Sequence, residues 1–268
     1  MARYVSDQSP ILKSKLRAGQ RRLYLRFIII FCIVVVIGAL VYFVFYTDTF
    51  KIKKLEVIGS RRIASDAVVD AVVNTMQEVS WRRWFDRDHI LFWLLGEKPK
   101  GSLGKLPIVE DISIKIDAWE RTIRMDVRER DLFGIWCTVQ DCYGFDRNGV
   151  VFASAPVSIG SLLLKVEDEN DRLIVSGYSV LPDRRWIQNI ITTLPALIAN
   201  QFNIVKIKIK ELNLREWVIT VDDGLDLYFS LDFVPESLND ILENLRDRLR
   251  LDGLTYIDFR VPNRIYYK

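Results

Sequence analysis

Apolar residues run unbroken through one stretch of the chain and alternate with polar residues through most of the rest. The unbroken stretch, Phe27–Tyr46, contains no charged side chain. As a helix rising 1.5 Å per residue it is about 30 Å long, which matches the hydrocarbon core of a bilayer. Its β-branched run Ile33–Ile37 disfavours a helix in water, but in lipid only hydrogen bonds within the helix satisfy the backbone. The pattern predicts a transmembrane helix over residues 27–46.

Alternation after this helix predicts a first compact unit over residues 50–130. We expect a strand over 50–58, a helix over 63–76, a short helix or strand-like connector over 90–95, and two strands joined by a hairpin at 118–121. The apolar positions share one face of each paired strand: Ile112, Ile114 and Ile116 in the first, and Ile123, Met125 and Val127 in the second. The predicted order is β-α-α-β-β.

Residues 131–268 predict a second unit that is mostly strands. The strands are expected over 132–137, 142–146, 150–152, 162–166, 205–209, 216–221, 225–229 and 255–268. Two apolar stripes at helical spacing predict helices over 186–199, bent or interrupted at Pro195, and over 236–251. The fold class is therefore α+β, with a single N-terminal transmembrane helix followed by two domains.

The distribution of charge sets the orientation of the helix. The net charge of the whole chain is +3. Seven basic residues against Asp7 give residues 1–26 a charge of +6, which leaves −3 on the remainder. Because basic flanks favour the cytoplasmic side, we predict that residues 1–26 are a cytoplasmic tail, disordered over 1–20, and that the C-terminal domains are extracytoplasmic. The acidic remainder argues against a nucleic-acid partner.

Cleavage after the apolar stretch is not expected. The stretch is longer than the core of a signal peptide, and the sequence TDTFKIKK that follows it offers no site of the small-x-small type. We therefore interpret residues 27–46 as a membrane anchor that stays attached to the chain.

Two of the three cysteines lie close enough in sequence to pair. Cys137 and Cys142 are separated by four residues and can face each other across a hairpin. An extracytoplasmic location permits a disulfide between them, which is the interpretation we favour over free thiols. A metal site is the weakest alternative, because neither a second pair nor a nearby histidine completes it. Cys32 lies within the apolar stretch and is expected to act as a small hydrophobe.

A search for catalytic chemistry finds no constellation in the sequence. Motifs for serine hydrolases, zinc proteases, penicillin-binding enzymes and phosphate-binding loops are absent. The only histidine, His89, is expected to be structural or on the surface, and the acidic pairs Asp168–Glu169 and Asp222–Asp223 are expected in solvated turns. We predict a protein that is not an enzyme, with no cofactor, metal or small-molecule substrate. The aromatic and basic segment Trp81–Phe85 is expected to pack in a core or on a domain surface rather than against lipid headgroups.

Several local motifs, taken in succession, resemble the FtsQ/DivIB family of bacterial cell-division proteins. The strand Phe50–Ile58, the step Leu106–Val109 and the strands leading to Glu129–Arg130, with Trp119 in the hairpin, are similar to a POTRA domain. The more specific cue is the ending Tyr256–Tyr267, YIDFRVPNRIYY, preceded by WVIT at 217–220 and DG at 223–224. The resemblance covers residues 21–268. Glu120 and Asp131 depart from it, because the family usually has proline at these positions.

The resemblance implies a non-enzymatic scaffold of the divisome at the division septum. Residues 50–130 would be the POTRA domain, associated with recruitment, and residues 131–268 the FtsQ/DivIB-type β-domain. This β-domain would bind FtsB- and FtsL-like bitopic partners, and other divisome components would join them. In the family, a strand of FtsB adds to the edge formed by the last strand.

The end of the chain suits such strand addition. A terminal strand has an uncovered outer side, and added strands bind through backbone hydrogen bonds. Because Pro262 lacks an N–H, pairing is expected along Asn263–Tyr267, with Tyr266 and Tyr267 on opposite faces. The predicted partner-binding residues are Arg260, Val261, Asn263, Arg264, Ile265, Tyr266 and Tyr267.

Two other classes of function compete with this interpretation. A membrane-anchored envelope enzyme, such as a cell-wall hydrolase, requires catalytic residues that the sequence lacks. A secretion or outer-membrane assembly factor with POTRA domains would be expected to carry several such units or a membrane barrel, and the sequence indicates neither.

Overall fold

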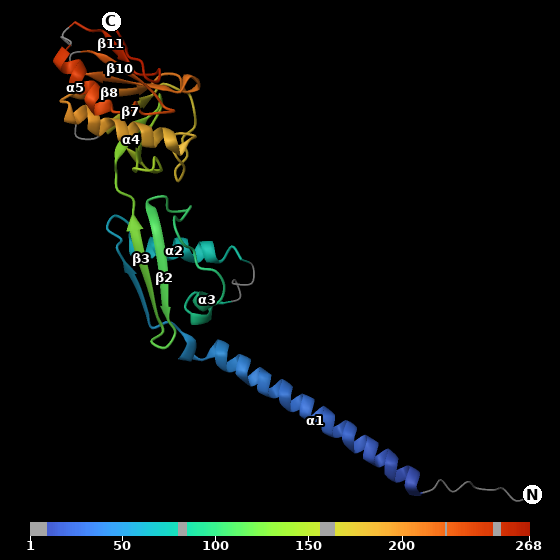
Figure 1. Ribbon diagram of the computed structural model, residues 1–268. Coiled ribbons are helices and arrows are strands. Elements are labelled where there is room, and N and C mark those ends of the chain that lie inside the picture. The colour runs from blue at the N-terminus through green and yellow to red at the C-terminus, as the bar shows by residue number, and fades with distance from the viewer. Residues whose placement is uncertain (1–9, 80–84, 156–163, 223, 249–252) are drawn as a thin grey trace, which may run out of the picture. The chain divides into compact units, whose positions relative to one another are not determined.

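The structure is a computed structural model that describes residues 10–79, 85–155, 164–222, 224–248 and 253–268 (Figure 1). It has a mixed α+β fold with one long apolar N-terminal helix and a sheet-rich C-terminal region. Within the described residues, the chain divides into two compact units. The first comprises Met1–Leu55, Ser80–Gly96 and Ile116–Ile123, and the second Glu56–Val79, Glu97–Lys115 and Arg124–Lys268. The predicted domain boundaries at 50 and 131 stay a prediction.

The N-terminal helix α1 runs from Pro10 to Tyr46. Its segment Tyr24–Tyr46 is long and apolar enough to cross a membrane. The prediction of disorder over residues 1–20 is wrong from Pro10 onward, and residues 1–9 lie outside the described part. Residues 11–26 consist mainly of Leu, Lys, Arg, Ala and Gln, which are good helix formers, so a helix already nucleated in the apolar stretch extends through them.

A three-stranded sheet follows in the order β1-β3-β2. Its strands are β1 (Lys54–Ile58), β2 (Val109–Asp117) and β3 (Thr122–Glu129), and the helices between β1 and β2 are α2 (Ser65–Met76) and α3 (Ile90–Leu94). A 3₁₀ helix, η1 (Asp48–Phe50), precedes β1. The predicted order, with two helices between the first and second strands, is therefore present. For residues 90–95 the sequence allowed a short helix or a strand-like connector, and the structure has a helix over Ile90–Leu94.

Alternate positions of β3 are buried, as its sequence pattern predicted. Ile123, Met125 and Val127 are at most 7% exposed, whereas Arg124 and Arg128, at alternate positions, are exposed. The close approach of the chain to the backbone of β3 requires a glycine at position 59. Gly59 has φ +94°, and a Cβ there would lie 2.1 Å from the carbonyl oxygen of Val127.

The second sheet has nine strands in the order β12-β11-β10-β9-β8-β7-β4-β5-β6. Neighbouring strands are antiparallel except for the pairs β10–β11, β4–β7 and β7–β8, which are parallel. The strands are β4 (Gly134–Cys137), β5 (Cys142–Phe145), β6 (Val151–Ala155), β7 (Leu164–Asp168), β8 (Ile204–Ile209), β9 (Glu216–Val221), β10 (Asp226–Ser230), β11 (Tyr256–Asp258) and β12 (Tyr266–Tyr267).

Two helices share the core of this sheet: α4 (Arg184–Ala199) and α5 (Leu238–Arg248). The side chain of Asp183 accepts the N–H of Arg185 at 2.8 Å, so α4 begins two residues before the predicted start. Pro195 lies within the helix without ending it. The apolar stripes of both helices join one cluster with the inner face of the sheet, including Ile187, Ile190, Leu194, Leu197, Leu238 and Leu242. A short 3₁₀ helix, η3 (Leu212–Leu214), leads into β9.

Candidate partner-binding edge

The end of the chain folds back on itself instead of forming one long strand. β11 pairs in parallel with β10, and β12 returns antiparallel to β11 with Ile257 opposite Tyr267 and Asp258 opposite Tyr266. Between them, the N–H of Arg264 donates to the carbonyl of Val261, and Asn263 has φ +60°. The prediction of a single strand over 255–268 is therefore wrong. Asn263 belongs to the turn, because the left-handed region is accessible to asparagine but interrupts a strand.

β12 is nevertheless the terminal strand of the nine-stranded sheet, at the opposite end from β6. The N–H of Lys268 donates to the carbonyl of Tyr256 at 3.2 Å, and the N–H of Tyr256 donates back to Lys268 at 3.3 Å. In an antiparallel pair, every second residue turns its N–H and C=O away from the neighbouring strand. Tyr267, next to Lys268, therefore directs its backbone N–H and C=O to the outer side of the sheet.

The side chains of the two terminal tyrosines are both partly exposed. Tyr266 is 46% exposed and Tyr267 is 52% exposed. The expectation that one of them packs inward is not met. Ile265 takes the inward position, because it packs against the main core cluster at the end of the turn. The two tyrosines that form β12 therefore both keep part of their side chains exposed at the end of the sheet.

Arg260 is held by side chains of its own domain. Its Nε and Nη2 donate to the two carboxylate oxygens of Asp258 at 2.9 and 2.6 Å, and its Nη1 donates to Glu216. The guanidinium also lies 5.0 Å from the centre of the Tyr228 ring. The hydrogen bonds to Asp258 raise the pKa of Arg260, and those to Glu216 act in the same direction. Burial opposes ionisation of Asp258, but the hydrogen bonds from Arg260 outweigh it and lower the pKa of Asp258. Arg260 thus fixes the start of the turn.

A groove of about 690 Å³ lies beside this turn. It separates the segment after β10 from the β11–β12 connection, and its apolar lining includes Val234, Ile241, Phe259 and Ile265. Phe259 forms the floor next to the core, since it is 2% exposed and stacks on Phe229 with ring centres 4.9 Å apart. The sequence offered no signal for this groove, because its two sides are not neighbours along the chain.

The predicted pair Cys137 and Cys142 forms a disulfide. The two residues are directly opposite each other at the ends of β4 and β5, and both are 7% exposed. The bond therefore closes the hairpin where its loop begins.

Replacing Cys137 and Cys142 by alanine is expected to lower the free energy of unfolding by about 2 kcal/mol, because the closed loop is short. Urea unfolding of the full chain in detergent, with and without a reductant, measures this difference. Cys32→Ala serves as the control and is expected to unfold like the wild type under both conditions. Equal midpoints for the double variant and the oxidised wild type would show that the disulfide adds no stability.

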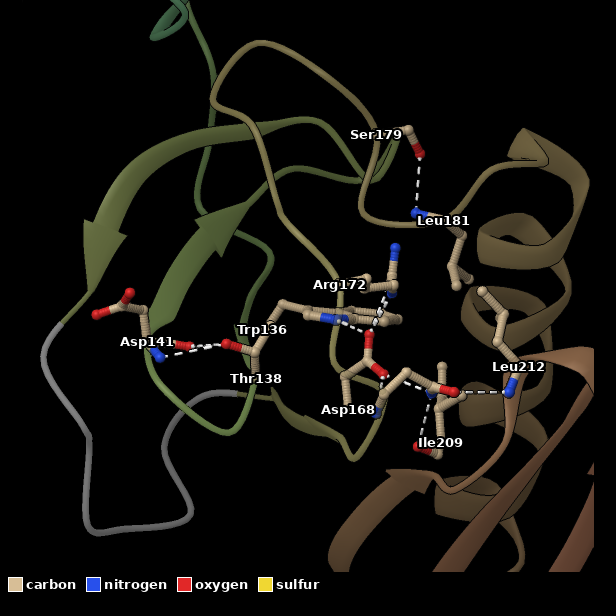
Figure 2. Close-up of polar contacts among 10 residues, drawn as sticks. Trp136, Thr138, Asp141, Asp168, Arg172, Ser179, Leu181, Ile209 and Leu212 are labelled. Carbon is tan, nitrogen blue, oxygen red and sulfur yellow. Dashed lines mark hydrogen bonds and ion pairs between the residues drawn. The ribbon is translucent and has the colours of Figure 1, made fainter.

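The acidic pair Asp168–Glu169 was expected in a solvated turn, and for Asp168 this is wrong. Its side chain is fully buried and accepts hydrogen bonds from Trp136 Nε1 at 2.9 Å and Arg172 Nε at 2.8 Å (Figure 2). Asn170 Nδ2 donates to the other carboxylate oxygen at 2.7 Å. A carboxylate so fully paired organises the segment after β7 and has no free lone pair aimed at a cavity. Asp223 of the second acidic pair lies outside the described residues.

His89 has the structural role that the sequence predicted. It is 7% exposed, and its Nδ1 accepts the N–H of Leu91 at 3.2 Å as the cap of α3. Its Nε2 therefore carries the proton and donates to the carbonyl of Val44 at 2.9 Å. In the part of the chain that the structure describes, no group of three or more His, Cys, Asp or Glu side chains could hold a metal ion.

The sequence motif Glu129–Arg130 marks a polar junction whose contacts were not predicted. Glu129 accepts the backbone N–H groups of Arg61, Arg62 and Ile63, at distances between 2.6 and 3.3 Å, just before α2 begins. Burial opposes the ionisation of Glu129, but these hydrogen bonds and those from the Arg62 side chain lower its pKa. Glu129 therefore ties the end of β3 to the loop between β1 and α2.

Neither the family models nor the curated protein sequences compared with this chain give a match. The resemblance to the FtsQ/DivIB family, and with it the assignment of residues 50–130 and 131–268 to that family's domains, stays a prediction.

Proposed function

We propose that this chain is a non-enzymatic, single-pass membrane scaffold of the bacterial divisome. In this proposal, residues 1–26 are cytoplasmic, α1 spans the inner membrane, and the C-terminal domains act outside the cytoplasm at the division septum. Residues 50–130 are a POTRA domain, for which the order β1-α2-α3-β2-β3 gives support. Residues 131–268 are the partner-binding β-domain.

The proposed partner is an FtsB-like bitopic protein, bound together with its FtsL-like companion. A strand of this partner adds to β12 and continues the nine-stranded sheet. The observation that carries the proposal is the position of β12 at the edge, where Tyr267 directs its N–H and C=O outward. Backbone pairing gives such a complex its affinity, and alternate side chains give it specificity.

In this proposal, the predicted site residues have two different roles, which follow from their contacts. Tyr266 and Tyr267 meet the partner directly, whereas Arg260 and Asn263 shape the turn that presents them. Val261, Arg264 and Ile265 line the groove beside the edge, which has room for an apolar side chain from the same added strand.

Co-purification of the intact protein from membranes tests this function. We expect FtsB- and FtsL-like bitopic coiled-coil proteins to be recovered with the wild-type chain in mild detergent. A cell-wall hydrolase assay on the same preparation is expected to give only background activity. Recovery of the chain without such partners, or with a wall-degrading activity that follows the protein through purification, would contradict the proposal.

A further inference from the structure

Trp119 is the most exposed large apolar side chain for which the structure gives an exposure, at 96% of its surface. It lies at the tip of the hairpin between β2 and β3. The carboxylate of Asp117 accepts the N–H groups of Trp119 at 2.9 Å and Glu120 at 2.8 Å, and Arg121 follows with φ +58°. These hydrogen bonds fix the turn, so the indole is presented outward by a defined backbone.

The same hairpin is tied to the chain just beyond the membrane-spanning helix. Arg121 Nη1 donates to the carbonyl oxygens of Asp48 and Thr49 at 2.9 and 3.0 Å, and the carbonyl of Arg121 accepts the N–H of Lys53 at 3.0 Å. α1 ends at Tyr46, only two residues before Asp48. The tip of the hairpin and the end of α1 therefore belong to one local structure within the first unit.

A second segment binds the last turn of α1. His89 donates to the carbonyl of Val44, one of the groups that a helix end leaves without an internal partner. The ring of Phe45 stacks on Phe85 with centres 5.4 Å apart and on His89 at 6.0 Å. These contacts restrain the end of the helix against the rest of the first unit, so the position of the hairpin relative to Tyr46 is determined by more than Arg121 alone.

We propose that Trp119 inserts into the interfacial layer of the bilayer that α1 spans. Trp119 and Arg121 are two positions apart, which is at most about 7 Å of chain, and each interfacial layer is roughly 5–8 Å thick. Tryptophan favours this layer, because its ring is largely apolar and its N–H is polar. Tyr42 and Tyr46 are both exposed and stack with ring centres 5.0 Å apart, so they mark where the interfacial layer meets this end of α1.

Lipid is the occupant that these contacts favour. The hydrogen bonds of Arg121 hold the tryptophan beside the point where the chain leaves the apolar layer, so the nearest large apolar surface is the membrane itself. Insertion gives the first unit a second attachment to the bilayer besides the helix. Rotation of this unit about the axis of α1 is then restricted.

Fluorescence quenching of the full chain in phosphatidylcholine–phosphatidylglycerol vesicles tests the insertion. The emission of Trp119 is obtained as the difference between the wild type and Trp119→Phe. We expect this difference to fall about twofold when the vesicles contain a lipid with a nitroxide near its glycerol backbone, and to be protected from iodide in the water phase. A difference signal that iodide quenches and the nitroxide lipid leaves unchanged would overturn the proposal.

Two further variants separate insertion from simple exposure. Leu173 is 87% exposed in the second unit, so Leu173→Trp in the Trp119→Phe background provides an equally exposed indole outside the hairpin. Its emission is expected to be quenched by iodide and not by the nitroxide lipid. Arg121→Gln removes the two guanidinium hydrogen bonds to the carbonyls of Asp48 and Thr49 in η1 and is expected to reduce lipid quenching of Trp119. Unchanged lipid quenching in Arg121→Gln would overturn the positioning role of Arg121.

Discussion

Deletion of Arg264–Lys268 is expected to abolish binding of an FtsB-like partner while the three-stranded sheet stays folded. The deletion removes β12 and leaves β11, which pairs with β10, as the new edge. The two exposed tyrosines and the outward backbone groups of Tyr267 are lost with it. A pull-down of the purified partner by the membrane-extracted chain measures the effect, and circular dichroism shows whether the remaining strands are retained.

A substitution at Tyr267 separates backbone pairing from side-chain contact. Tyr267→Pro removes an N–H that points away from β11, so the chain's own sheet loses no hydrogen bond, whereas an added strand loses one. An acceptor left unpaired in an interface costs about 1–3 kcal/mol, which corresponds to a dissociation constant roughly 5- to 150-fold higher. Tyr267→Ala is the matched control, because it removes the ring and keeps the N–H.

Strand addition requires the proline variant to weaken binding more than the alanine variant. The opposite order would show that the partner recognises the tyrosine ring and does not pair with the backbone. Lys268→Pro adds a second comparison, because the N–H of Lys268 bonds to Tyr256 within the sheet. It is expected to weaken the β11–β12 pairing itself, which lowers the melting temperature as well as the affinity.

The alternation of apolar and polar residues predicted those helices and strands whose position depends only on the local sequence. Ile123, Met125 and Val127 alternate with polar residues, and this period alone determines which face of β3 is buried. At the end of the chain the same alternation led to the wrong prediction of a single strand. The alternation in YIDFRVPNRIYY fits one strand as well as a hairpin, although Pro262–Asn263 is a turn signal that could have distinguished them.

The polar contacts of the interior could not be predicted in this way. Asp168 meets Trp136, and Arg130 meets Asp146, only after separate strands have come together. Whether an acidic residue after a strand is solvated or buried depends on what packs over it, and local sequence does not carry that information. The prediction for the start of α1 was wrong for a different reason. A polar composition without a sustained period suggested disorder, but good helix formers next to an established helix extend that helix.

Breaking the buried ion pair between Arg130 and Asp146 is expected to cause the largest loss of stability. Their side chains are 8% and 6% exposed, and Arg130 Nε also donates to the carbonyl of Pro107 at 2.8 Å. The other oxygen of Asp146 accepts the N–H groups of Asn148 and Val150 at 2.8 and 2.9 Å. Arg130→Ala leaves the buried carboxylate of Asp146 without its positive partner and the carbonyl of Pro107 without the Arg130 donor. We expect this to lower the free energy of unfolding by about 3–5 kcal/mol.

Urea unfolding of the full chain in detergent measures this loss, with Arg124→Ala, on the strand that leads to Arg130, as the control. Arg124 pairs with Glu56 at 3.2 Å, but its side chain is 54% exposed, so its removal should cost at most about 1 kcal/mol. Adding Asp146→Asn to Arg130→Ala removes the unpaired charge and keeps an oxygen for Asn148 and Val150. The double variant should therefore recover roughly 0.5–3 kcal/mol relative to Arg130→Ala alone. If Arg130→Ala proves no more costly than Arg124→Ala, or if Asp146→Asn restores nothing, the loss does not arise from the buried charge.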